Sequence, residues 1–127
     1  MAGMNKIESY LMDLDIAYQE VSPSAFFVED ATKGLPGISI TLSEPIVLMR
    51  AFVMKAPKSQ RADLFEKLLR LNGTDMVHGA YGLDAEDVVL IDTLEYDTMD
   101  KAEFEAALDS IGLALSRHYG TLGAFRN

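Results

Sequence analysis

The sequence has no cysteine and only two histidines, His78 and His118, among its 127 residues. Without cysteine the chain forms no disulfide and has no thiolate chemistry. Two histidines are also too few for a metal site built from cysteine and histidine ligands. Folding therefore has to rest on an apolar core. A chain of this length buries roughly two-thirds of the surface that its unfolded form exposes, so we expect one domain over residues 1–127.

Basic residues are scarce as well, with 11 Lys and Arg against 20 Asp and Glu, for a net charge of −9. Such a field repels nucleic acid and anionic membrane surfaces, and it favours a polypeptide partner with basic character. The longest apolar run, Ile46–Met54, is interrupted by Arg50 and is far shorter than the ~20 residues of a membrane-spanning helix. Because the N-terminus lacks the pattern of a signal peptide, we expect a soluble, cytoplasmic protein.

Motifs of enzyme chemistry are absent too. The sequence contains neither the phosphate-binding patterns GxxxxGK[ST] and GxGxxG nor a GxSxG elbow. The acidic turn Asp84–Asp87 lacks the ligand spacing of a calcium loop. An enzyme hypothesis therefore depends on a histidine, for example His78 beside Asp75 or Asp92 as a general base. We expect His78 on a strand surface and His118 at the edge of a helix, with no catalytic residue, metal or cofactor.

Three segments have the apolar spacing of amphipathic helices. In the second and third segments, Gly73 and Gly120 stand where a left-handed residue would end each helix. Asp100, three residues before Glu103, is typical of a capping box at a helix start. The expected helices cover residues 7–14, 59–72 and 100–119.

Strand patterns occupy the stretches between these helices. Ile38–Leu42 alternates between apolar and polar residues, and Ile46–Met54 is apolar at almost every position. Further strands are expected at 76–83 and 88–94, with weaker candidates at 16–21 and 25–29. Short connections require antiparallel pairing. The fold class predicted is α+β, an antiparallel sheet with three helices in the order α-β-β-β-α-β-β-α.

A hairpin turn at Ser43 and Glu44 would place Ile40 opposite Val47 and Ile38 opposite Met49. One sheet face would then be wholly apolar, because directly opposed residues share a face. This predicted core face comprises Ile38, Ile40, Leu42, Val47, Met49, Ala51 and Val53. The reverse face mixes Ser39 and Thr41 with Ile46, Leu48, Arg50, Phe52 and Met54. Its surplus of large apolar residues predicts that a partner covers it.

The second hairpin can be treated in the same way, with Asp84–Asp87 as its tip. Leu83 would then oppose Val88, Tyr81 would oppose Leu90, and Val77 would oppose Leu94, all on the core face. His78 would lie on the mixed reverse face.

The stretches "LFEKLLRLNG", "GAYGLDAEDVVLIDTL" and "DKAEFEAALDSIGLAL", together with the element order, resemble the type III secretion chaperones of the Tir-chaperone (CesT-like) family. The resemblance implies a homodimer, built through the second helix and an adjacent strand, that holds an extended segment of a client (effector) polypeptide without ATP or metal. YbjN-like proteins share this fold. The alternative is therefore a YbjN-like regulatory or stress-related protein that binds a folded partner.

Two sets of residues are candidates for these contacts, and ordinary core is the alternative for each residue. The client-binding candidates are Ile46, Leu48, Phe52 and Met54, with Ile7 and Leu11. The dimer-interface candidates are Leu64, Leu68 and Leu71. One departure from the family concerns Pro23, which interrupts the first strand region and would weaken client contact at that end of the domain.

Overall fold

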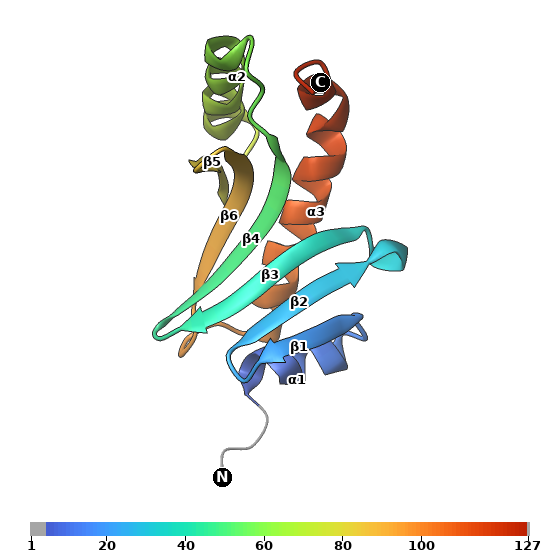
Figure 1. Ribbon diagram of the computed structural model, residues 1–127. Helices are drawn as coiled ribbons and strands as arrows, with labels where there is room; N and C mark the ends of the chain where they lie inside the picture. The colour runs from blue at the N-terminus through green and yellow to red at the C-terminus, as the bar shows by residue number, and fades with distance from the viewer. Residues whose placement is uncertain (1–4, 127) are drawn as a thin grey trace.

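The computed structural model of the chain describes residues 5–126. Six antiparallel strands form one sheet in the order β1-β2-β3-β4-β6-β5, and α1 and α3 lie behind it in the view of Figure 1. The helices are α1 (Lys6–Asp13), α2 (Arg61–Thr74) and α3 (Lys101–Gly123). The strands are β1 (Tyr18–Ser22), β2 (Ala25–Asp30), β3 (Leu35–Ser43), β4 (Ile46–Lys55), β5 (Ala80–Asp84) and β6 (Asp87–Glu95), with a short 3-10 turn, Ala31–Lys33, between β2 and β3.

The predicted fold class is confirmed, but four strands rather than three precede α2. The two weak strand candidates both form, and β1 and β2 make a hairpin at the edge of the sheet. Pro23 lies in the turn between them, where its missing N–H costs no hydrogen bond of the ladder. The proline therefore does not remove the first strand.

The core lies between the sheet and α1 and α3, and α2 adds Leu64 and Leu68 to it. The predicted apolar stripe of α3 is buried at Phe104, Ala107, Leu108 and Ile111. The predicted sheet residues Ile38, Ile40, Val47, Met49 and Ala51 are buried as well. The hairpin register differs from the prediction, since Ile40 pairs with Met49. This shift of two residues leaves the side chains from Ile38 to Phe52 on their predicted faces, because sheet faces alternate with a period of two.

A β-bulge in β4 corrects the prediction for Met54. Phe52 pairs with Val89 on β6 and Met54 pairs with the adjacent Val88, so Val53 is the extra residue. The bulge reverses the alternation at this point. Met54 consequently turns into the core with 4% of its surface exposed, and Val53 is only partly buried.

The second hairpin confirms the pairs Leu83 with Val88 and Tyr81 with Leu90. Its first strand is shorter than predicted and begins at Ala80. Val77 was predicted in the core but lies in the preceding loop with 89% of its surface exposed. Gly79 separates loop and strand with φ +78°, a conformation that L side chains rarely adopt.

The ends of the helices differ in part from the prediction. Asp100 forms the predicted capping box, accepting from the Glu103 amide (2.7 Å) while its own amide donates to the Glu103 carboxylate (3.0 Å). Neither Gly73 nor Gly120 has a left-handed conformation, and the helices continue to Thr74 and Gly123. Both predicted helix ends were therefore wrong, since helical packing overrides the weak preference of glycine.

Gly112 sets the distance between α3 and the turn that leads into β3. A Cβ atom at Gly112 would collide with the carbonyl oxygen of Gly34, a backbone atom, and would also touch Leu35. Gly34 has φ +69°, so its conformation is not easily changed. The absence of a side chain at Gly112 is what lets α3 lie this close to the sheet.

We predict that Gly112→Ala and Gly120→Ala have opposite effects on stability, although both lie in α3. Gly112→Ala must push the helix away from Gly34 and should lower the free energy of unfolding by about 1–3 kcal/mol. Gly120 has no heavy atom within 4 Å of a built Cβ, so Ala there should add about 0.5–1 kcal/mol through helix propensity. Urea unfolding measures both, and equal effects would contradict the close-packing argument.

Candidate functional site

The face of the sheet turned away from α1 and α3 is the candidate site, and Figure 1 looks onto it. The strand registers place side chains from four strands on this open face. These are Phe27, Ser39, Thr41, Ile46, Leu48, Arg50, Phe52, Val89 and Ile91. In residues 5–126 no helix covers them.

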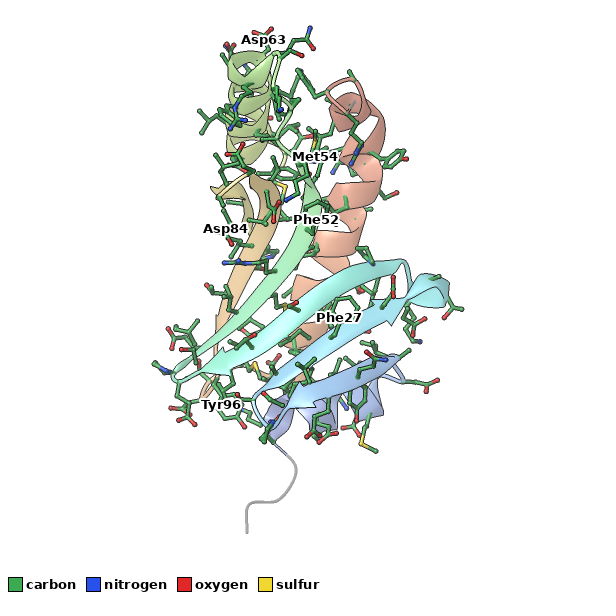
Figure 2. The ribbon with its side chains drawn as sticks, viewed as in Figure 1. Phe27, Phe52, Met54, Asp63, Asp84 and Tyr96 are labelled. Atoms are coloured by element: carbon green, nitrogen blue, oxygen red, sulfur yellow. The ribbon has the colours of Figure 1, made fainter. Side chains whose placement is uncertain are left out.

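Two aromatic rings rise from the open face, as Figure 2 shows for Phe27 and Phe52. The Phe27 ring lies against Gly37, where a Cβ would stand 2.7 Å from its Cζ atom. Phe52 leaves 57% of its surface exposed. A hollow of about 370 Å³ is lined by both rings and by Gly37 and Arg50. It is wide enough to receive an apolar side chain.

Two ion pairs lie on this face. Arg50 Nη1 lies 2.6 Å from Asp84 Oδ2, and Lys55 Nζ lies 2.7 Å from Asp87 Oδ1. Both pairs are at least partly exposed, so each contributes at most about 1 kcal/mol to stability. These pairs neutralise Arg50 and Lys55, whereas Glu95, which lies opposite Ile46 on the same face, is exposed and has no cationic partner within residues 5–126.

The client-binding candidates separate into two groups. Ile46 and Leu48 are partly exposed and Phe52 is largely exposed, all on the open face. Ile7 and Leu11 are fully buried between α1 and the sheet, since they form the apolar side of α1. Met54 is buried through the β4 bulge. For these last three residues the structure agrees with the alternative of ordinary core.

The dimer candidates are also mostly turned inward. Leu64 and Leu68 are buried with 0% and 7% of their surface exposed, and Leu71 is partly buried against the core. The exposed apolar residue of α2 is Leu69, at 71%. Sequence reasoning passed over it because the apolar face of α2 is broad and periodicity does not say which half packs inward.

His118 is buried and held by hydrogen bonds on both ring nitrogens. The Tyr81 hydroxyl lies 2.7 Å from Nδ1, and Asp75 Oδ2 lies 3.1 Å from Nε2. A carboxylate only accepts, so Nε2–H donates to Asp75, and in the neutral tautomer that this selects Nδ1 accepts from the Tyr81 hydroxyl. The hydrogen bond from His118 is the largest of several effects that lower the pKa of Asp75.

This network ties the end of α2 to β5 and α3. Asn72 adds two hydrogen bonds to the Tyr81 backbone, at 2.7 Å and 3.1 Å. Burial raises the pKa of Tyr81 to about 12, which makes its hydroxyl less reactive as a nucleophile or base. The hydrogen bonds of Asp75, Tyr81 and His118 therefore have a structural role, and we call these three residues the clasp.

His78 is exposed in the loop before β5, not on a strand as predicted. Its carboxylate neighbour Asp92 has a raised pKa because the carboxyl is partly buried, and the charge of His78 opposes this shift. Within residues 5–126 no group of three or more His, Cys, Asp or Glu residues is placed to hold a metal ion. No helix in the same range is long and apolar enough to span a membrane.

Comparison with solved structures identifies the fold. A chain of the heterodimeric ExoU–SpcU complex from the type III secretion system of Pseudomonas aeruginosa matches with TM-score 0.71 and 16% identity, over 87% of this chain and 93% of that chain. YbjN from E. coli matches with TM-score 0.71 and 16% identity, over 94% and 93%. A chain of the ExsC–ExsE complex matches with TM-score 0.59 and 14% identity, over 93% and 94%. No curated protein sequence matches at a significant level.

These likenesses define the class of protein, a domain with the fold of the type III secretion chaperones and YbjN. The family follows from the sequence itself. The chain belongs to the CesT_Tir_1 family, whose model matches residues 2–127.

We predict that Asp75→Asn lowers stability at neutral pH and that the loss shrinks in acid. The pKa of the Asp75 carboxyl is lowered by folding, so the folded protein binds its proton less tightly than the unfolded chain. The stabilisation is complete above the ordinary pKa of 3.8 and is lost as the pH falls below it.

Urea unfolding at pH 7 and at pH 3 measures this difference. Asp109→Asn, at an exposed position of α3, removes one carboxylate without touching the clasp and serves as the control. A loss for Asp75→Asn that is equal at both pH values would contradict the assignment.

Proposed function

We propose that this protein is a non-enzymatic, cytoplasmic binding protein that holds an extended segment of a client polypeptide on the open face of its sheet. The observation that carries the proposal is the uncovered apolar surface formed by Phe27, Leu48 and Phe52, with Ile46 and Ile91 beside them. An apolar surface of this kind on a polar protein is typical of a binding site.

An extended segment suits this surface better than a small molecule does. The hollow between Phe27 and Phe52 is shallow and lies on a sheet, whereas sites for small ligands are enclosed. The sheet also ends in two edge strands, β1 and β5, whose free backbone groups can pair with an added strand. In the ExoU–SpcU and ExsC–ExsE complexes a chain with this fold is bound to another protein, which supports a polypeptide partner here.

We further propose that two copies associate through the outward side of α2. Leu69 is the large apolar residue that this helix exposes, and a two-fold contact would bury it against its own copy. Leu64, Leu68 and Leu71 lie on the inward side of the same helix, in the core or packed against it, and support this surface from within. The dimer contact and the open face are formed by different elements, so one does not block the other.

A second candidate function follows from YbjN, which matches a slightly larger share of this chain than the secretion chaperone complexes do. In that case the open face would bind a folded regulatory partner. The two functions differ in the state of the partner. A client held as an extended segment is protected from proteolysis only over that segment. A folded partner resists proteolysis over its whole chain.

We predict that Leu48→Ala combined with Phe52→Ala weakens binding of the client by at least about 100-fold, since each large side chain contributes about 1.5–3 kcal/mol when buried. The client is obtained by affinity capture of complexes from the source cells. Leu113→Ala, at an exposed position of α3 away from the open face, should bind as the wild type does. Unchanged binding by the double variant, or failure of the wild type to retain any specific polypeptide, would refute the proposal.

We predict that Leu69→Glu converts the dimer to a monomer without loss of monomer stability. Leu69 is 71% exposed within one copy. The charge of a glutamate at this position is therefore destabilising only where a second copy covers it. Sedimentation equilibrium gives the mass, and circular dichroism gives the thermal midpoint. Val21→Glu, on the edge strand β1 and 68% exposed, is the matched control. A wild-type protein that is already monomeric would overturn the assigned contact.

A further inference from the structure

A second hollow adjoins the open face, and its charged lining residues are all basic. It lies between the C-terminal end of β4, the loop that leads into α2, and the last residue described, Arg126. Its volume is about 650 Å³. We call it the basic groove, and its lining comprises Phe52, Val53, Met54, Lys55, Ala56, Pro57, Lys58, Ser59 and Arg126.

The lining of the basic groove holds three cationic residues and no acidic one, although Asp and Glu outnumber Lys and Arg by 20 to 11 in the chain. Lys55 is paired with Asp87 at 2.7 Å. Lys58 has no carboxylate partner within residues 5–126, and the same holds for Arg126. Two exposed cations therefore remain available to an incoming anionic group.

Arg126 is nevertheless positioned by its surroundings. Its guanidinium lies over the Tyr119 ring, 4.8 Å from the centroid, and donates to the Tyr119 carbonyl at 3.3 Å and to the Val53 carbonyl at 3.5 Å. Stacking and hydrogen bonds of this kind hold the side chain in place, so less entropy is lost when it binds a carboxylate.

The backbone beside the groove favours a polypeptide over a small anion. β3 pairs with β4 only as far as Ala51, because the two strands diverge beyond it, as Figure 1 shows. Phe52–Lys55 therefore present an edge without a neighbouring strand on this side. An extended segment can form main-chain hydrogen bonds with such an edge, whereas a free phosphate cannot use it.

Phe52 connects the two hollows, since it lines both of them. A segment that places an apolar side chain against Phe52 on the open face would continue directly along the edge of β4 towards Lys58. We propose that the basic groove recognises carboxylate side chains next to the apolar anchors of the client segment. This inference rests on the proposed function and adds the chemical character of the segment.

The test is a selection of random peptides of about ten residues, which span roughly 33 Å when extended. Peptides are selected separately on the wild type, on a groove variant and on a control. The groove variant is Lys58→Glu with Arg126→Glu. The control is Lys33→Glu with Lys101→Glu, two exposed positions outside the groove that change the net charge equally.

The wild type should select peptides in which Asp or Glu stands beside Phe, Leu or Ile. The groove variant should lose that acidic preference and bind the wild-type peptides about tenfold more weakly, as expected for two exposed ion pairs. The control should retain both properties. Light scattering should give the same mass for all three proteins.

Selection of apolar peptides with no acidic preference would overturn the inference and leave the proposed function standing. Selection of no peptide at all would refute both the inference and the proposed function. A smaller mass for the groove variant than for the control would mean that a second copy of the chain occupies the groove, which would also overturn the inference.

Discussion

The packing of α1 and α3 on the same side of the sheet is the constraint on which the rest of the structure depends. α3 crosses the sheet behind β3, β4 and β6, and the missing side chain at Gly112 lets it lie close enough to exclude water from the core. With both helices committed to one face, no helix within the described residues covers the other. The open face is a direct consequence, and its apolar residues would be a liability without a partner.

The sequence was enough to predict which sheet residues share a face, because side chains alternate between the two faces and an error of two residues in the pairing changes nothing. Ile38, Ile40, Val47 and Met49 fall on the buried face even though the assumed turn was displaced by one residue and the pairs by two. The same alternation identified Leu48 and Phe52 as residues in need of a cover. The capping box at Asp100 was equally local, since both partners lie within one helical turn.

Features that depend on a distant neighbour could not be predicted. The bulge that buries Met54 arises where β4 meets β6, and nothing near Met54 in the sequence signals it. The clasp of Asp75, Tyr81 and His118 joins residues up to 43 positions apart. Helical periodicity could place His118 only at the edge of a stripe. In α2, Leu68 and Leu69 are adjacent and equally apolar, so only the position of β5 decides which one packs inward.

The distribution of charge bears on the selectivity of the proposed binding surface. At physiological ionic strength the Debye length is about 8 Å, so a carboxylate in the basic groove interacts chiefly with Lys58 and Arg126 and much less with acidic side chains elsewhere. Beyond that distance, the net charge of −9 attracts basic segments. The open face between these regions offers apolar contact through Phe27, Leu48 and Phe52. If the proposed client segment uses both the open face and the basic groove, its acidic residues would lie at the end of the segment that reaches Lys58 and Arg126.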